Sequence, residues 1–589
     1  MSLVNIKIEG RPYQVEEGLT ILEAARRCGY EIPSLCSFNH GECSLASCRV
    51  CLVEVVGAKG LVASCVYPVS EGMEIIISSP KATKARRISV ELLLSNHSQN
   101  CQQCDKNGHC ELLYVAQLTG ARENAFQGEK TPATIDAVTP SIVRDTSKCI
   151  LCGRCVARCE NAHGKGVLGF ENRGFSTIVA PAGNRKLDKS PCILCGQCVS
   201  VCPTGALMEK SEIDKVDEAF RQGKFVVVQT APAVRAAIGE EFGMKIGTPA
   251  TGKMVAALHR LGFHRVYDTD FAADLTIMEE ATELLGRVKN GGKLPMITSC
   301  SPGWINYAEC YFGDHLDHLS SCKSPHEMMG AIIKSYFAEK NGLDPKNIFV
   351  VSIMPCTAKK FEKERPQNAA VEGLPDVDAV LTTRELARLI KRSGIQFKKL
   401  PDEEFDQDLL GEASGAGVIF GVTGGVMEAA LRTAYKVLEG KEHDAIKFEA
   451  VRGFDGIKEA SLELGGMTVN VAVAHGMKNA SVLLDQIKAG TSKYHFIEIM
   501  GCPGGCINGG GQPYVRNCFL PDEDVDIMDT YRAKRAQALY SEDERNVLRQ
   551  SHNNTQIQQL YAEYLGEPNS HRAHELLHTS YAAREPFPG

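Results

Sequence analysis

Eight cysteines between residues 149 and 202 stand at spacings that hold iron. They form two C-x2-C-x2-C-x3-C runs: Cys149, Cys152, Cys155 and Cys159, followed by Cys192, Cys195, Cys198 and Cys202. A pair of such runs binds two 4Fe–4S clusters, and the fourth cysteine of each run ligates the other cluster. Pro203 follows the second run directly, as is typical of this pattern. We therefore predict an electron-carrying module over residues 139–209.

The first 80 residues carry a second cysteine pattern. Its members, spaced C-x11-C-x2-C-x13-C, are Cys36, Cys48, Cys51 and Cys65. The expected elements around them are three short strands, 4–8, 53–56 and 73–77, and one helix, 20–28. This arrangement resembles the β-grasp fold of plant-type 2Fe–2S ferredoxins with a longer first gap, although a zinc site is an open alternative. We predict a 2Fe–2S domain over residues 1–79, with Cys28 and Cys43 in structural roles.

A third ligand set follows a helix expected at residues 89–95. It consists of one histidine and three cysteines: His97, Cys101, Cys104 and Cys110. The ligand types alone suit zinc, whereas the position between two electron-carrying modules favours a 4Fe–4S cluster with one histidine ligand. A neutral imidazole in place of a thiolate makes the cluster less negative and raises its potential. His109 competes as the ligand, but His97 has the better spacing, and we predict this domain over residues 80–125.

Three further cysteine segments lie in the last 380 residues. They are 298–304 (TSCSPGW), 354–362 (MPCTAKKFE) and 498–513 (EIMGCPGGCINGGGQP). Each places a cysteine beside glycine or proline, where small residues let the backbone approach a bulky inorganic group. Buried free cysteines are the simpler alternative. Three such segments in a chain that already holds cluster motifs favour an inorganic centre.

The elements that must position these segments alternate between strand and helix. Apolar strand-like runs are expected at 224–229, 348–352 and 418–421, with helical stretches between them. This alternation is typical of an α/β domain with parallel sheets, here predicted over residues 210–525. The stretch 526–589 is polar and favours helix, and it shows no site chemistry. The predicted fold class is therefore multidomain, α+β and α/β.

The three cysteine segments resemble the signature loops of FeFe-hydrogenases, and the order of the accessory modules is similar to that of the multi-cluster members. The chain most resembles the catalytic subunit of NAD(P)-linked multimeric FeFe-hydrogenases, although the single-chain clostridial type has the same layout. The resemblance implies reversible H2 oxidation and proton reduction at an H-cluster, a 4Fe–4S cubane joined through one thiolate to a two-iron site with CO, CN⁻ and an azadithiolate bridge. It also implies three accessory 4Fe–4S clusters, one 2Fe–2S cluster and a small-subunit-like helical segment at 526–589.

The resemblance assigns roles in the large domain. Cys356, Cys502 and Cys506 match the cubane ligands, with Cys506 as the bridging thiolate, and Lys359 matches a lysine that hydrogen-bonds a cyanide. The residues expected to line the dry pocket are Ala231, Pro232, Ser324, Pro325, Met354, Phe420 and Met500.

One position departs from the family pattern. The family's first loop reads Thr-Ser-Cys-Cys-Pro, so Ser301 stands at the fourth cubane ligand and Cys300 at the proton-shuttling cysteine. Iron–sulfur clusters prefer soft thiolate over a serine oxygen. Three outcomes stay open: Ser301 ligates as an alkoxide, Cys300 replaces it as ligand, or the cubane is altered, and the chain could also be an engineered variant.

A helix expected from Asp274 onward carries the predicted proton path. With Asp274 as its N-cap, Glu280, Glu283 and Arg287 fall on one face at i, i+3 and i+7. A solvated face with a Glu283–Arg287 pair is the alternative. The resemblance implies a relay in the order Cys300, Glu283, Ser320, Glu280, with Arg287 at its outer end. His326 stands where the family often has glutamine, and its effect is left open.

Composition limits the partners. The formal net charge is −7, which gives no electrostatic case for nucleic acid or an anionic membrane. There is no 18-residue apolar run and no signal-peptide core near the first residues, and the cysteine motifs fit reduced thiolates, so we expect a cytoplasmic protein. Residues 411–417 lack the spacing of a dinucleotide fingerprint, so NAD(P)H would need another subunit.

By resemblance, the expected partners are H2 and protons, ferredoxin and/or an NAD(P)H-binding flavin subunit with a small 2Fe–2S subunit, and H-cluster maturases. The alternative function is a non-catalytic electron-transfer or H2-sensing protein on the same framework. Ser301 is the feature that favours this alternative.

Overall fold

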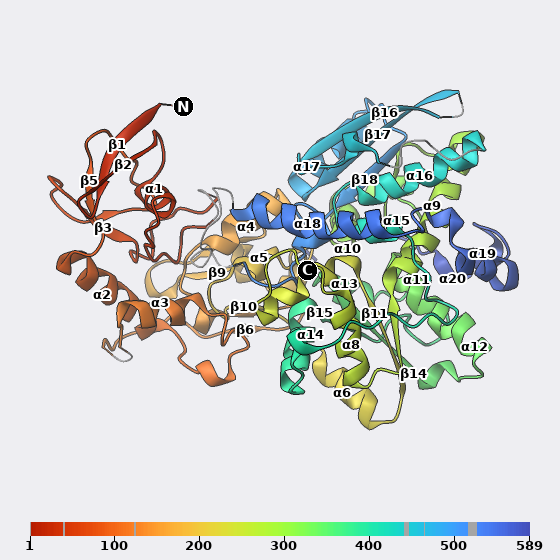
Figure 1. The fold of residues 1–589 in the computed structure, drawn as a ribbon, viewed down its shortest axis with the longest axis horizontal. Coiled ribbons are helices and arrows are strands. Elements are labelled where there is room, and N and C mark those ends of the chain that lie inside the picture. The colour runs from red at the N-terminus through yellow and green to blue at the C-terminus, as the bar shows by residue number, and fades with distance from the viewer. Residues whose placement is uncertain are drawn as a thin grey trace.

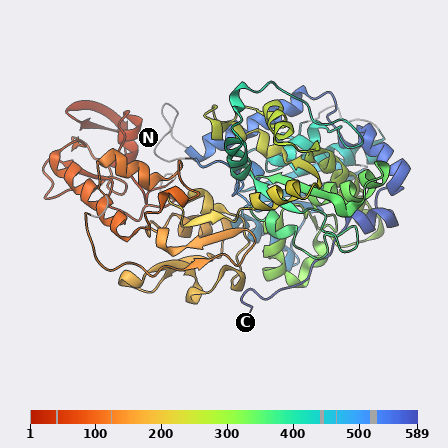
Figure 2. The ribbon, with the colours of Figure 1, turned by 90° about the horizontal axis from the view of Figure 1, so that it is seen from below.

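The computed structural model describes residues 2–38, 42–122, 125–440, 447–464, 466–515 and 527–588. The small modules of the first 209 residues lie at one end of the molecule and the large module at the other (Figures 1 and 2). The eight-cysteine module lies between the N-terminal modules and the large one (Figure 1). The cysteine motifs therefore follow one another along the molecule as they do along the chain.

The N-terminal module is a five-stranded mixed sheet in the order β2-β1-β5-β3-β4. Its strands are β1 (Leu3–Ile8), β2 (Arg11–Glu16), β3 (Leu52–Val55), β4 (Val62–Ala63) and β5 (Glu74–Ile76). Helix α1 (Ile21–Arg27) begins with a capping box in which Thr20 and Glu23 satisfy each other's backbone N–H groups. The three strands and the helix predicted here are confirmed.

Two helices form the next module. Helix α2 (Pro80–Asn96) begins nine residues before the predicted start, because Ser79 caps it and Pro80 occupies its first position. Helix α3 (Glu111–Thr119) begins directly after Cys110. Between the two helices, residues 97–110 carry the histidine and the three cysteines.

The eight-cysteine module contains a local repeat. Its strands are β6 (Ile135–Asp136), β7 (Ile142–Asp145), β8 (Leu168–Glu171), β9 (Ile178–Pro181) and β10 (Leu207–Glu209). Helices α4 (Arg154–His163) and α5 (Gln197–Val201) pack together, and each starts after a glycine with positive φ, 77° at Gly153 and 70° at Gly196. Positive φ favours glycine, so the two cysteine runs share one backbone path.

The large module is built on two sheets. One is fully parallel, in the order β12-β11-β14-β15, and the other has the order β13-β18-β17-β16, with only β16 antiparallel. The strands are β11 (Phe225–Thr230), β12 (Arg265–Asp268), β13 (Met296–Ile297), β14 (Ile348–Met354), β15 (Ala379–Thr382), β16 (Ile457–Leu464), β17 (Met467–His475) and β18 (Phe496–Met500). The predicted α/β class with parallel sheets is confirmed.

The strand predicted at 418–421 is wrong. This run forms a short helix, α15 (Gly415–Val418), followed by a 3-10 turn (Ile419–Gly421). Ser414 caps the helix through its side chain, and α15 packs against other helices, so apolar residues that read as a strand are buried between helices.

Helices cover both sheets. Their bounds are α6 (Ile213–Arg221), α7 (Pro232–Arg235), α8 (Thr251–Leu261), α9 (Thr269–Asn290), α10 (Pro302–Tyr311), α11 (Pro325–Ile332), α12 (Ala338–Lys340), α13 (Lys359–Glu362), α14 (Thr383–Arg392), α16 (Gly425–Glu439) and α17 (Met477–Lys488).

The N-cap predicted for the proton-path helix is also wrong. Helix α9 begins five residues before Asp274, and Asp268 caps it. Asp274 is fully buried inside the helix, where its carboxylate accepts hydrogen bonds from Ser414 and Asn554. Its carboxylate therefore joins distant segments instead of starting the helix.

The C-terminal segment is helical, as predicted. It forms α18 (Ile527–Arg545), α19 (Thr555–Leu560) and α20 (His571–Leu577), and α18 lies across the large module against α15 (Figure 1). Buried Arg535 pairs with Glu240 at 2.6 Å, and buried Arg432 pairs with Asp543 at 3.0 Å. Among the described residues, no helix has the length and apolar character needed to cross a membrane.

Candidate metal centres and proton path

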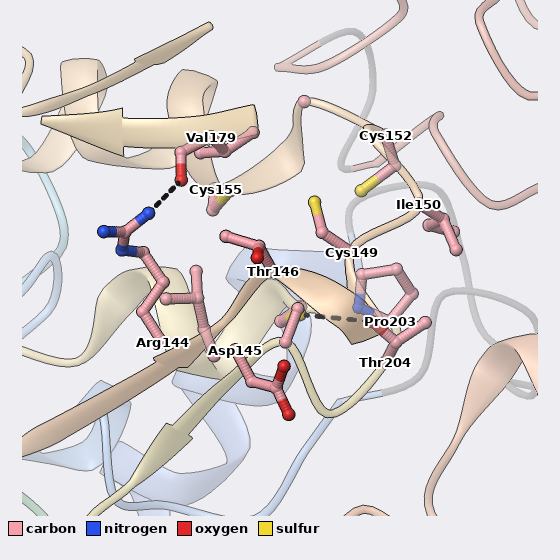
Figure 3. Close-up of a pocket in the computed structure, with 14 residues that line it drawn as sticks. Arg144, Asp145, Thr146, Cys149, Ile150, Cys152, Cys155, Val179, Pro203 and Thr204 are labelled. Atoms are coloured by element: carbon pink, nitrogen blue, oxygen red, sulfur yellow. Dashed lines mark hydrogen bonds between the residues drawn. The ribbon is translucent and has the colours of Figure 1, made fainter. Parts of the chain in front are cut away.

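The eight cysteines of the two runs line two cavities, and the fourth cysteine of each run lies in the cavity of the other run. The cysteines of the first cavity are Cys149, Cys152, Cys155 and Cys202; those of the second are Cys159, Cys192, Cys195 and Cys198. Figure 3 shows Cys149, Cys152 and Cys155 around the first cavity. This is the grouping that the spacing predicts for two 4Fe–4S clusters.

Burial holds these thiols in their protonated form. It raises the pKa of Cys149 to about 11 and that of Cys192 to about 12. Iron binds the thiolate, so a cation in the cavity is what would favour loss of these protons. Four soft sulfur donors around one small apolar space fit a 4Fe–4S cluster.

The four cysteines of the N-terminal module are buried together. The Sγ atoms of Cys51 and Cys65 lie 3.4 Å apart. Hydrogen bonds from Cys48 and Cys65 lower the pKa of Cys36, which places all four thiols within one network. An all-sulfur set of this kind fits the predicted 2Fe–2S cluster.

At the third site, the two candidate histidine ligands have different surroundings. His97, Cys101 and Cys110 line one cavity of about 290 Å³. Burial lowers the pKa of His97 to about 4, and its Nδ1 is buried with no hydrogen-bond partner among the described residues, as suits a neutral metal ligand. His109 instead places its Nε2 3.3 Å from Glu241. Cys104 does not line this cavity; its sulfur lies 2.6 Å from where a Cβ on Gly205 of the eight-cysteine module would stand.

The large module brings its cysteine loops together at the carboxyl ends of parallel strands. Cys356 follows β14, Cys502 follows β18, and Cys300 follows β13. Carboxyl ends of neighbouring strands are where α/β folds place their sites. Cys356, Cys502 and Cys506 interact electrostatically with one another, and burial raises the pKa of Cys506 to about 12. The three thiols form a soft donor set that fits a cubane.

Close packing explains the glycines of the third loop. Gly505 has a φ of 95°, and a Cβ there would lie 2.7 Å from the backbone nitrogen of Thr423. Only glycine fits without moving the backbone. The pocket residues predicted from the resemblance lie where the strands and helices meet; all are buried except Pro325, which is partly exposed: Ala231, Pro232, Ser324, Pro325, Met354, Phe420 and Met500.

Ser301 and Cys300 face different neighbours. The Oγ of Ser301 accepts a hydrogen bond of 3.0 Å from the backbone N–H of Gly501, next to Cys502. Burial and then the carboxylate of Glu280 raise the pKa of Cys300. The serine hydroxyl is thus beside the cubane-ligand loop, and the Cys300 thiol is near the predicted relay.

Lys359 is held by a carboxylate that the sequence reasoning did not assign. Its Nζ lies 2.7 Å from the Oε2 of Glu362 and donates to the carbonyl oxygen of Cys300 at 3.1 Å. The same Oε2 lies 2.8 Å from the Nε2 of His326. Burial and Lys359 lower the pKa of His326, but Glu327 and Glu362 outweigh them and raise it. The i,i+3 spacing of Lys359 and Glu362 was the available signal.

The proton-path residues lie together, but in a different order from the predicted one. Glu280 is the carboxylate beside Cys300, and burial followed by Glu283 raises its pKa to about 8. Ser320 donates to Glu283 at 2.9 Å and also acts on Glu280, whose pKa its side chain lowers. Arg287 pairs with Glu283 at 2.6 Å. The observed order is therefore Cys300, Glu280, Ser320, Glu283, Arg287, because Glu283 sits a turn further along α9.

Direct hydrogen bonds tie the second cavity to the large module. Thr357 donates to the carbonyl of Leu194 at 2.7 Å, and Gln197 donates to that of Asn508 at 2.7 Å. These residues neighbour cysteines on both sides of the contact. The second cavity is therefore the one next to the large-module thiols.

The first cavity touches both N-terminal modules. The thiol of Cys43 lies 3.7 Å from the carbonyl of Cys152, and Ser98 donates to Ser147 through the backbone at 2.9 Å. A buried Arg154–Glu111 pair at 2.9 Å adds a second link to the histidine-containing module. The first cavity is a branch point between the two N-terminal sites.

The C-terminal segment, in which the sequence shows no site chemistry, contacts residues next to the predicted relay. Tyr581 donates to the carbonyl of Ser320 at 2.9 Å. A ring nitrogen of His578 lies 2.8 Å from the hydroxyl of Ser321. The composition of this segment predicts helix but not these contacts, because they form only when the segment folds back onto the large module.

Family models match almost the whole chain. The iron only hydrogenase large subunit, C-terminal domain, matches residues 224–510, and the iron hydrogenase small subunit matches 529–584. Three iron–sulfur models match the N-terminal part: a 2Fe-2S iron-sulfur cluster binding domain (2–80), the NADH-ubiquinone oxidoreductase-G iron-sulfur binding region (86–125) and a 4Fe-4S dicluster domain (148–206). These matches favour iron over zinc at both N-terminal sites.

Two relatives align from end to end. The NADP-reducing hydrogenase subunit HndD of Solidesulfovibrio fructosivorans is 49% identical and covers 99% of this chain and 100% of its own. Iron hydrogenase 1 of Clostridium pasteurianum is 45% identical, covering 98% of this chain and 99% of its own. A solved variant of the FeFe-hydrogenase HydA1 from Chlamydomonas reinhardtii is 42% identical with a TM-score of 0.55, over 62% of this chain and 98% of that one.

Proposed function

Because this chain belongs to the FeFe-hydrogenases, oxidoreductases that act on H2, we propose that it interconverts H2 with protons and electrons at an H-cluster held by Cys356, Cys502 and Cys506. The family and the multidomain fold predicted from the sequence are confirmed by the full-length relatives and the matching models. The observation that carries the proposal is the meeting of three thiols, of buried Cys502 and half-buried Cys356 and Cys506, with the Lys359 ammonium where parallel strands end. When bound, the H-cluster supplies the heterolytic cleavage and formation of H2.

The other protein groups have distinct tasks in this proposal. Lys359 offers a positive charge to an anionic ligand, and Glu362 fixes the position of that charge. Cys300 and Glu280 carry the proton, because a carboxyl with a pKa of about 8 both gives and takes protons near neutral pH. The buried, mostly apolar residues around the thiols keep bulk water out.

Ser301 takes the fourth ligand position in the proposal, with its oxygen toward iron. Its hydroxyl is beside the Cys502 loop, whereas the Cys300 thiol is near Glu280. This division leaves Cys300 in the relay. The alternative function, a non-catalytic electron carrier or H2 sensor, rests on the serine at this position.

Electrons leave through the accessory sites in an order that the contacts support. They pass from the second cavity to the first, and there the route divides toward His97 and toward the N-terminal cysteines. We assign three accessory 4Fe–4S clusters and one 2Fe–2S cluster to these four sites. The modules are 1–79, 80–125, 139–209, 210–525 and 526–589.

The electron acceptor is an NAD(P)H-binding flavin subunit with a small 2Fe–2S subunit, and/or ferredoxin. The name of the S. fructosivorans relative, an NADP-reducing hydrogenase subunit, supports a nicotinamide-linked partner. Loading of the two-iron site by H-cluster maturases and the cytoplasmic location inferred from the reduced thiols belong to the same proposal.

The test is H2-dependent reduction of methyl viologen by anaerobically purified protein coexpressed with the maturases. The wild type is expected to reduce the dye, and Cys506→Ser to lose nearly all activity because the bridging thiolate is gone. A wild type with full iron–sulfur content but no activity would contradict the proposal.

A further inference from the structure

A buried histidine of the C-terminal segment joins two carboxylates of α9. The Nε2 of His578 lies 3.1 Å from the Oε2 of Glu279, and its Nδ1 lies 2.8 Å from the hydroxyl of Ser321. Glu279 is completely buried, and His578 is 8% exposed. The same carboxylate also accepts hydrogen bonds from Tyr561 and from the backbone of Asn569, so C-terminal residues surround it.

The same histidine lies beside the outer carboxylate of the relay. The ligand atoms of Glu283, Cys322 and His578 all lie within 4.8 Å of one another, and the Cys322 sulfur is 3.8 Å from the Oε2 of Glu283. A single water molecule spans such a distance for proton transfer. A proton on Glu283 is therefore within reach of an imidazole, whereas the Arg287 guanidinium stays protonated and only pairs with the carboxylate at the other end of the path.

From His578 the way to solvent is short. The ring of His574, four residues earlier, lies against that of His578 in a tilted arrangement with centroids 3.9 Å apart, and His574 is exposed. The titratable groups that face His578 are Glu279, Glu283 and Cys322 from the large module and His574 from its own helix. Burial, and then His578, lower the pKa of His574, which suits release of a proton to water.

We propose that the His578–His574 pair is a second exit of the proton path, supplied by the C-terminal segment and branching from Glu283. This inference rests on the proposed relay from Cys300 to Glu283. In H2 oxidation, the proton on the Glu283 carboxyl passes to the ring nitrogen of His578 that carries no proton, and the ring becomes an imidazolium. The imidazolium gives a proton to His574 or to water, and Glu283 returns to its carboxylate form. No electron moves in this step, and proton reduction runs it in reverse.

The first test removes the imidazole ring of His578 by substitution and then supplies imidazole in solution. His578→Ala is expected to lower H2 turnover roughly twofold, because one of two exits for the proton closes. Imidazole added to the variant should restore the rate, whereas pyrazole, which has the same shape but takes no proton near neutral pH, should not. Equal rescue by both compounds, or no loss of rate at all, would overturn the inference. The matched control is His571→Ala, which removes an exposed histidine of the same helix and should keep the wild-type rate.

The second test places His578 downstream of Glu283. Turnover of the double variant Glu283→Gln/His578→Ala should equal that of Glu283→Gln alone, because residues in one pathway are not additive. Independent, multiplied losses would show that the histidine acts by holding the fold, and would overturn the inference. If Glu283→Gln itself keeps full activity, the proposed relay fails; if only His578→Ala does, the relay stands and the branch fails.

Discussion

At the scale of single residues, the site depends on which atom each side chain presents to the centre. Ser301 and Cys300 are neighbours in sequence, yet the serine hydroxyl bonds to Gly501 and the cysteine thiol is near Glu280. An oxygen and a sulfur differ in softness, so under the proposed ligation by Ser301 an exchange of the two would change the properties of the iron.

Ser301→Cys is expected to give the cubane a fourth thiolate and to shift its reduction potential upward, because an alkoxide holds its charge more tightly and favours the oxidised iron. The potential is measured by redox titration followed by electron paramagnetic resonance. Ser299→Cys is the control and should leave the potential unchanged, because the wild-type Ser299 hydroxyl donates to the carbonyl of Cys322. An unchanged potential in Ser301→Cys would show that this side chain does not reach the iron.

Glu280 sets a pH dependence with a defined sign. Its pKa of about 8 means that it is protonated below that pH and charged above it. H2 oxidation needs the carboxylate to accept a proton, so its rate should rise as pH increases through about 8. Proton reduction needs the acid form and should fall over the same range.

Glu280→Gln is expected to lower both rates about 100-fold or more, the usual loss for a proton-transfer group, and to flatten the step near pH 8. Steady-state assays in both directions across pH 6–10, roughly the range around the step, measure it. A full-rate Glu280→Gln variant, or one that keeps the step, would remove Glu280 from the path.

At the scale of elements, the strand ends and the C-terminal helix hold the cysteine loops. Helix α18 reaches across the large module, where Arg535 pairs with Glu240 and donates to the carbonyl of Ile507, directly after Cys506. The C-terminal segment therefore supports a cluster loop as well as the proton path.

Arg535→Met should destabilise the protein by about 3 kcal/mol, because it leaves the Glu240 carboxylate without its partner in a protein interior. Thermal unfolding of anaerobic protein, followed by circular dichroism, measures the loss. Arg545→Met, an exposed arginine of the same helix, is the control and should change the unfolding temperature little. Equal effects of both substitutions would mean that the buried pair is not what anchors α18.

Local signals predicted several of these elements. Strands β11 and β14 are mostly apolar runs, and α1 has a complete capping box, so all three were predictable from neighbours in sequence. The strand predicted at 418–421 was wrong, because an apolar run of four residues is too short to show whether its periodicity is that of a buried strand or of a buried helix. The order of Glu280 and Glu283 and the roles of Glu362 and His578 depend on contacts between distant segments, which spacing does not encode.

At the scale of the whole molecule, the sites follow one another from the large module to the second and then the first cavity, and beyond the first cavity they divide between the two N-terminal modules. The second cavity is bonded to the large module, and the first touches both N-terminal modules (Figure 1). In the proposed function, contact of the first cavity with both modules makes it the shared step for electrons.

Cys155→Ser should therefore stop H2-driven reduction of both N-terminal clusters, because Cys155 lines the shared cavity. Cys51→Ser should affect the 2Fe–2S cluster alone and leave the histidine-ligated cluster reducible. Freeze-quenched samples under H2, examined by electron paramagnetic resonance, distinguish the two. Reduction of the N-terminal clusters at the wild-type rate in Cys155→Ser would contradict the forked route.

The infrared spectrum of anaerobic, maturase-coexpressed protein tests the central claim most directly. If these loops hold an H-cluster that turns over H2, bands of CO and CN⁻ bound to iron appear, and they shift when argon is replaced by H2. Protein with its full content of iron and sulfide but no such bands would contradict the claim and leave an electron carrier on a hydrogenase framework.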